Sequence, residues 1–223
     1  MAYILSEEEA RVLGALLEKQ MTTPEYYPMS VNALTNACNQ KSNRHPVVNY
    51  EESTVLETVD SLRRKGLAIV VTGAGSRVRK YEHKVKETLF LNQKEQAALC
   101  MLMLRGPQTV GEIRTRTDRM ATFQDLTEVE DTLRDLAAKE RTPQPLVMML
   151  PRFPGQKENR YIHLLSGEPD VEALSAEEAA ATAVSSRSAN ETRITELEAK
   201  VENLSGELQA LKEQFNQFRK QFE

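Results

Sequence analysis

The 223-residue sequence predicts an α+β protein, mostly helical, in which two tandem winged-helix domains are followed by a linker and a C-terminal coiled-coil helix. Three observations lead to this prediction. The same order of helix and hairpin signals occurs twice, residues 167–190 shift to Ala, Ser and Glu, and a heptad pattern fills residues 191–223.

Helix-capping side chains mark the start of each helix expected in the first domain, residues 1–90. A Ser or Asn accepts a hydrogen bond from the first turn, and a Glu three residues later returns one. The expected caps are Ser6 with Glu9, Ser30, and Asn49 with Glu52. Two β-rich runs around Gly-Ala-Gly-Ser then predict a hairpin within residues 67–84. Three helices and a hairpin follow one another in the order of a winged helix.

The second domain, residues 91–166, repeats this order. Its expected caps are Asn92 with Glu95, Thr109 with Glu112, and Asp125 with Glu128. Two strands separated by a Pro- and Gly-containing turn follow within residues 145–165. The apolar positions of the two third helices align at a constant offset of 74, as Val55, Val59 and Leu62 with Val129, Leu133 and Leu136. This alignment indicates an internal duplication.

Apolar residues at alternating spacings of three and four predict a coiled coil over residues 191–223, after the linker 167–190. The expected oligomerisation residues are Ile194, Leu197, Val201, Leu204, Leu208, Leu211, Phe215, Phe218 and Phe222. We expect a parallel homodimer. The three phenylalanines would also suit a trimer or an antiparallel pair, and the helix could instead fold back onto its own winged helices.

Long motifs in the sequence resemble a known family. The stretches RVLGALLEKQMTTPEYYPMSVNALTNACNQKSNRHPV, LRGPQTVGEIRTRTDRM and LPRFPGQKENRYIHLL closely resemble the YceH-like family of bacterial proteins, which are built from tandem winged-helix domains. The similarity runs from about Ile4 to Leu165. It implies the fold, and no activity, because the family has no established biochemical role.

Basic residues are concentrated around the first domain's polar turn and hairpin. Residues 41–86 contain 10 Lys and Arg against 5 Asp and Glu, a local charge of +5. Such a surface favours nucleic-acid phosphates, and Asn and Arg can also bond to base edges. The candidate nucleic-acid-binding residues are Lys41, Asn43, Arg44, Arg63, Arg64, Arg77, Arg79 and Lys80. The asparagines could equally build turns, and the charges could simply be solvated.

Acidic residues on both third helices argue against ordinary recognition of a DNA groove. The first carries Glu51, Glu52, Glu57 and Asp60, and the second carries Glu128, Glu130, Asp131 and Asp135. These side chains would repel phosphates. A weaker basic cluster in the second domain, Arg114, Arg116 and Arg119, is expected to pair with that domain's own acidic helix.

Catalytic, metal and membrane functions find little support in the sequence. The start, MAYILSEEEAR, turns acidic too early for a signal peptide, and no 18 apolar residues are consecutive. The two cysteines are far apart and the three histidines are isolated. We therefore expect a cytoplasmic binding protein without cofactor or metal that is not an enzyme. It would bind nucleic acid, with a protein-interaction scaffold as the alternative.

Overall fold

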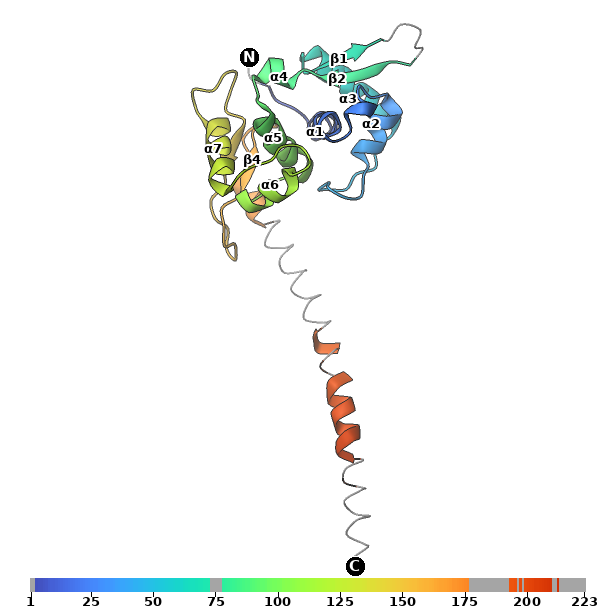
Figure 1. Ribbon diagram of the computed structural model, residues 1–223, viewed down its shortest axis with the longest axis vertical. Coiled ribbons are helices and arrows are strands. Elements are labelled where there is room, and N and C mark those ends of the chain that lie inside the picture. Colours follow the sequence, from blue (N-terminus) through green and yellow to red (C-terminus); the bar gives the residue numbers. More distant parts are fainter. Residues whose placement is uncertain are drawn as a thin grey trace, which may run out of the picture. The chain divides into compact units, whose positions relative to one another are not determined.

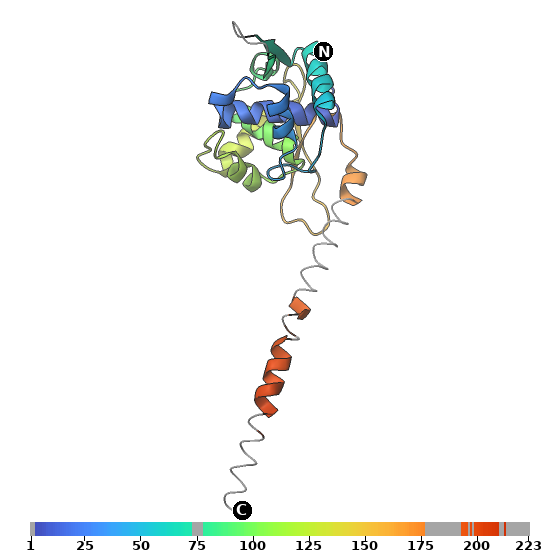
Figure 2. The same cartoon turned by 90° about the vertical axis from the view of Figure 1, so that its right-hand side faces the viewer.

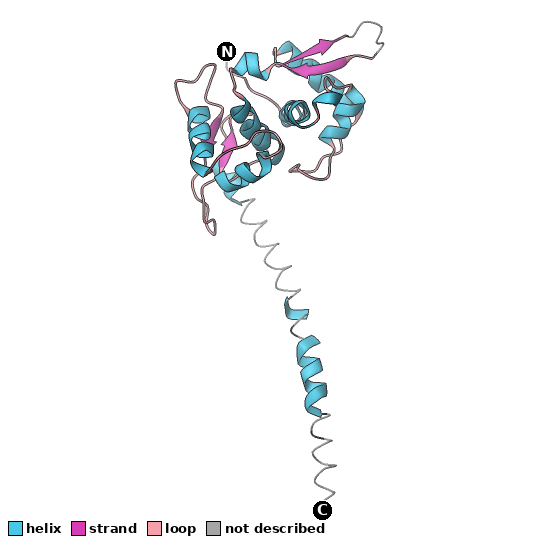
Figure 3. Ribbon diagram, viewed as in Figure 1, coloured by secondary structure: helices cyan, strands magenta, loops and turns pink. Residues whose placement is uncertain are grey.

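The computed structural model describes residues 3–72, 78–176, 193–195, 197, 199–209 and 212. The chain forms two compact units, Met1–Pro169 and Asp170–Glu223. Its fold is α+β and mainly helical, and the described residues contain two small antiparallel sheets (Figure 3).

The first half of the larger unit contains three helices and a hairpin. Its elements are α1 (Glu7–Thr22), the short 3-10 helix η1 (Pro24–Tyr26), α2 (Val31–Cys38), α3 (Glu52–Arg64), β1 (Ala68–Val71) and β2 (Lys80–His83). The caps at Ser6 and Ser30 form as predicted. The cap predicted at Asn49 is wrong, because α3 begins after Glu51 and has no side-chain cap. The Glu52 carboxylate instead accepts a hydrogen bond from Asn32 of α2, at 2.6 Å.

The second half has the same order of elements. After the short helix α4 (Val85–Leu89), which the sequence patterns did not predict, it contains α5 (Gln93–Arg105), α6 (Val110–Thr117), α7 (Leu126–Ala137), β3 (Val147–Met149) and β4 (Tyr161–His163). All three predicted caps form, at Asn92, Thr109 and Asp125.

Pairing and burial are also repeated between the halves. A residue that lies shortly before the second helix pairs with the hairpin in each half, as Met29 with Tyr81 and as Gln108 with Tyr161. The aligned positions of the two third helices are all fully buried: Val55, Val59 and Leu62 of α3, and Val129, Leu133 and Leu136 of α7.

Helix α1 joins the two halves through one hydrophobic core. It lies between α2 on one side and α5 on the other (Figure 1), and a single buried cluster extends from Leu5 to Leu165. Helices α1 and α5 approach closely at Gly14 of α1, since a Cβ there would lie 2.9 Å from Cδ2 of Leu104 in α5. The division into domains 1–90 and 91–166 stays a prediction, and the halves share their core.

The described residues of the smaller unit are helical wherever they form regular structure. Residues 171–176 are helical, and helix is present again over 193–195 and 199–209. Most of the predicted linker, residues 177–190, lies outside the described residues. Among the described helices, none has both the length and the apolar character needed to cross a membrane.

Candidate nucleic-acid interface

The polar turn between α2 and α3, residues 39–51, is closed at its base by Asn39. The Asn39 side chain donates to the backbone oxygen of Tyr50 and accepts from its backbone nitrogen, both at 2.8 Å. An asparagine used in this way holds a loop closed, so its paired hydrogen bonds are made to the backbone and not to a base. The turn lies on the side of the first half opposite β1 and β2 (Figures 1 and 2).

Arg44 is buried, which corrects its assignment as a nucleic-acid contact. Its side chain makes a bidentate ion pair with Glu18 of α1, at 3.0 and 2.6 Å, and also donates to the backbone oxygens of Ala37 and Asn43. An arginine has five N–H groups, and these five hydrogen bonds use all of them. No donor of Arg44 remains for a phosphate or a base.

The Glu18–Arg44 pair places two opposite charges inside the protein. Burial alone would raise the pKa of Glu18, but the hydrogen bonds and charge of Arg44 outweigh it, so that this pKa lies below its ordinary value. Arg11, also buried, donates to the backbone oxygen of Pro46 at 2.6 Å. Two arginines therefore hold the turn against the protein interior.

The turn also contacts the second half. Asn43 has a left-handed backbone with φ of 58°, and its side-chain oxygen accepts from Arg105 at the end of α5, at 2.7 Å. The backbone nitrogen of His45 donates to the oxygen of Leu104 at 2.9 Å. Asn43 thus has a structural partner although it is exposed, while Lys41 is an exposed residue of the turn.

Most basic residues of the first half outside the turn lie at the end of α3, on the hairpin and at the start of α4. Residues 63–86 contain eight Lys and Arg and one Glu, a charge of +7. Three of the cations have carboxylate partners: Arg63 with Asp60, Lys65 with Glu9, and Lys84 with Glu82. Arg77 lies outside the described residues.

Four exposed cations in this segment have no carboxylate partner among the described residues. We call them the basic hairpin surface: Arg64, Arg79, Lys80 and Lys86. Lys86 was not among the predicted binding residues. It is one of the ten cations counted over residues 41–86, so local charge alone could not distinguish it from its neighbours.

The strand register places Lys80 of the basic hairpin surface at the far end of the hairpin ladder. His83 pairs with Ala68 at the base, and Lys80 pairs with Val71 at the far end of the ladder. Three steps along a strand cover about 10 Å, so Lys80 lies about that far from the base of the ladder. Tyr81 and His83 are buried while Lys80 is exposed, so strand alternation directs Lys80 away from the core.

The start of α3 has the opposite charge. Glu52 and Glu57 are exposed on it, together with Leu56. Exposed carboxylates near phosphates would weaken binding, so this part of α3 is unsuited to a DNA groove. Favourable charge is confined to the C-terminal end of α3 and the hairpin.

Two of the three arginines predicted to form a cluster in the second half have local partners, although not those predicted on α7. Arg116 pairs with Glu112 of the same helix at 3.1 Å and donates to Gln108. Arg114 donates to the backbone oxygen of Gln124, and Arg119 is exposed. This cluster offers fewer available cations than the hairpin of the first half.

Two of the three histidines have a lowered pKa, the buried His83 and the half-buried His163. Burial lowers the pKa of His83 and that of His163 to about 4. The Nδ1 atom of His83 accepts from the backbone nitrogen of Val85 at 3.3 Å, and its Nε2 lies 2.6 Å from Oε1 of Gln20. Within the described ranges, no three His, Cys, Asp or Glu side chains come together in a group able to hold a metal ion.

Five of the nine predicted oligomerisation residues can be placed. Ile194, Leu197, Val201, Leu204 and Leu208 are all exposed. The other four predicted positions, Leu211, Phe215, Phe218 and Phe222, lie outside the described residues.

Comparison with known proteins identifies the family and no activity. The sequence model of the family described as "Protein of unknown function, DUF480" matches residues 5–156. A UPF0502 protein of Geobacter sulfurreducens is 50% identical over 226 residues that cover all of both chains. A UPF0502 protein of Photobacterium profundum is 49% identical over 93% of this chain and 95% of its own. Another, from Geotalea daltonii, is 56% identical over 78% of each chain. The extent of these matches shows that the chain belongs to the DUF480 family, whose curated relatives are UPF0502 proteins, in agreement with the YceH-like resemblance.

Proposed function

We propose that this protein is a tandem winged-helix protein that binds nucleic acid through the basic hairpin surface. The observation that carries the proposal is the segment 63–86, which contains eight Lys and Arg against one Glu. Four of these cations are exposed and have no carboxylate partner among the described residues. The repeated order of three helices and a hairpin supports the winged-helix assignment.

The charge distribution favours contacts to phosphates over recognition of bases. Arg64, Arg79, Lys80 and Lys86 are long cationic side chains spread over the hairpin and the helix ends beside it, and Glu52 and Glu57 would oppose entry of α3 into a groove. Contacts to phosphates position a protein on nucleic acid and carry no sequence information. We therefore expect binding that depends strongly on salt and little on sequence.

A salt titration tests the proposal. Replacing Arg64, Arg79, Lys80 and Lys86 by Ala should weaken binding to a fluorescently labelled DNA duplex. The slope of log affinity against log salt should become shallower by about 0.9 for each phosphate contact that is lost. The matched control removes four exposed cations from the second half, by replacing Arg119, Lys139, Arg152 and Lys157 with Ala.

The control separates specific placement from overall charge. Both variants lose the same formal charge, so a general electrostatic effect would change their slopes equally. We expect the control to keep most of the wild-type slope. Equal slopes in the two variants, or a wild-type protein that does not bind at low salt, would contradict the proposal.

A protein-interaction scaffold is the second candidate, and the exposed face of α7 favours it. Glu130, Asp131 and Asp135 are exposed there beside Leu126, and of this group only Asp131 has an ion-pair partner, Arg134, among the described residues. An acidic face with an exposed leucine suits a basic protein partner better than nucleic acid. Co-purification of a stoichiometric protein without nucleic acid would support this candidate.

A further inference from the structure

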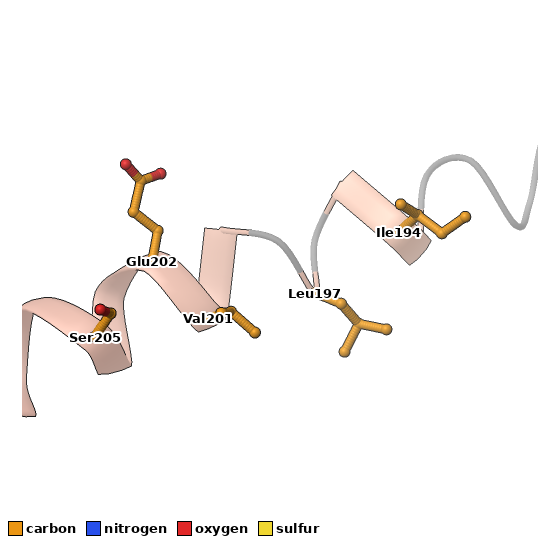
Figure 4. A pocket seen from close by; sticks show the side chains of 5 residues that line it. All are labelled: Ile194, Leu197, Val201, Glu202 and Ser205. Atoms are coloured by element: carbon orange, nitrogen blue, oxygen red, sulfur yellow. The ribbon is translucent and has the colours of Figure 1, made fainter.

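An apolar stripe without a covering partner runs along the helix of the smaller unit. Ile194, Leu197, Val201, Leu204 and Leu208 are each between 50% and 65% exposed. In Figure 4 the side chains of Ile194, Leu197 and Val201 project from the side of the helix opposite Glu202. Leaving such a stripe in water is unfavourable, because apolar area gains free energy when it is buried.

We propose that this stripe binds the same stripe of a second copy of the chain, as a parallel two-stranded coiled coil. The apolar residues recur at alternating spacings of three and four, which average 3.5 residues. A straight α-helix has 3.6 residues per turn, so a stripe with this repeat stays in contact only with a helix that supercoils around it. A flat protein surface or an irregular groove would not match this spacing over several turns.

The types of residue in the stripe favour two strands. Ile194 and Val201, which are β-branched, occupy the first apolar position of their heptads, and Leu197 and Leu204 occupy the second. In parallel coiled coils this distribution favours dimers over trimers and tetramers. The first two heptads of the stripe thus favour two strands, whereas Leu208, which also occupies the first position, and the phenylalanines further along do not add to this preference.

The charges beside the stripe fit a second copy in parallel register. Arg193 then faces the position of Glu198 in the partner, and Glu207 faces that of Lys212. The remaining flanking position within the described helix sets Lys200 against Ser205, so no like charges meet. In the antiparallel alignment that pairs Leu208 with Leu204 of the second copy, Glu207 would meet its own copy, which disfavours that alignment.

Sedimentation equilibrium of the full chain tests the assembly. We expect a mass of about 50 kDa, twice the 25.2 kDa of one chain. Replacing Leu204 and Leu208 together by Glu should give a monomer, because two charges would enter the stripe. In the matched control, Asn203→Glu with Gln209→Glu adds the same two charges outside the stripe and should remain dimeric.

Several results would overturn the proposal. These are a monomeric or trimeric wild-type protein, a dimer that survives Leu204→Glu with Leu208→Glu, or a control variant that dissociates.

Orientation is measured separately, with a spin label on Ala199→Cys. The two native cysteines are buried and do not compete for the label. A parallel pair holds the two labels at the same height, whereas the antiparallel alignment that pairs Leu208 with Leu204 of the second copy separates them by about 20 Å along the axis. A long label-to-label distance would overturn the parallel arrangement.

Discussion

Arg44 and Arg64 are both arginines of the basic region, yet they have opposite environments. Arg44 is 5% exposed and bonded through all its donors to Glu18 and backbone oxygens, whereas Arg64 is exposed at the end of α3. The sequence could not separate them, because Glu18 lies 26 positions from Arg44. Charged side chains are also mostly exposed in proteins, which made a surface role the natural expectation.

Arg44→Met should destabilise the protein without affecting nucleic-acid binding. Removing one partner leaves Glu18 buried without its counter-charge, which costs about 3–5 kcal/mol. Denaturant unfolding would measure this loss. The salt dependence of duplex binding should stay as in the wild type under conditions where the variant is folded.

The control for Arg44 is Arg63→Met. Arg63 forms an exposed pair with Asp60, and exposed pairs contribute less than about 1 kcal/mol. A similar loss of stability in both variants would mean that the buried pair has no special role. A marked reduction of the salt slope in Arg44→Met would return this residue to the binding surface.

At the scale of elements, local signals predicted most helix starts, and packing determined the rest. Ser6, Asn92 and Thr109 each form a capping box with a glutamate three residues later, and such a pair can be recognised without knowledge of the tertiary structure. The start of α3 could not be predicted in this way, because Glu52 bonds to Asn32 of another helix.

Helix α1 shows what apolar periodicity missed. Its leucines predict one buried face, but all residues from Glu9 to Glu18 are buried, because α5 covers the side that carries Gly14. Small residues at Ala10 and Gly14 were the available signal, since they permit close helix packing. The sequence does not show that the two halves share a core, so the helix that packs against these small residues could not be identified from it.

Two helical glycines should respond in opposite ways to replacement by Ala. Ala is about 1 kcal/mol more favourable than Gly inside a helix. At Gly14 the added Cβ would lie 2.9 Å from the buried Leu104 side chain, and the overpacking should outweigh this gain and destabilise by about 1–2 kcal/mol.

Gly111 of α6 is the matched control. A Cβ there has no neighbour closer than 4.0 Å, so Gly111→Ala should be neutral or stabilising by up to about 1 kcal/mol. Thermal unfolding of both variants would show the difference in sign. A stabilised Gly14→Ala variant would contradict close packing between α1 and α5.

At the scale of the whole molecule, charge is divided between the two ends of the sequence. Residues 1–90 and 91–166 each have a net charge of +1, whereas residues 167–223 have 6 basic against 12 acidic residues, a net −6. The acidic tail lowers the charge of the complete chain to −4 and hides the +7 of residues 63–86. Composition alone therefore suggests no nucleic-acid partner, and the local surface does.

Dimerisation would add to the effect of that surface. Two copies of the basic hairpin surface in one assembly would engage a long nucleic acid together, and the second contact would form at a raised effective concentration. The two proposals are nevertheless independent. The hairpin variant leaves the apolar stripe intact, and the stripe variant leaves the hairpin intact.

Hydrogen exchange with and without a DNA duplex tests binding through the basic hairpin surface, because it shows which backbone segments the nucleic acid protects. At low salt, we expect slower amide exchange on duplex addition in peptides that cover the end of α3 and residues 78–86. We expect little change in α7 or in the turn 39–51. Protection centred on α7 or on the turn, or no protection in any segment, would contradict binding through the basic hairpin surface.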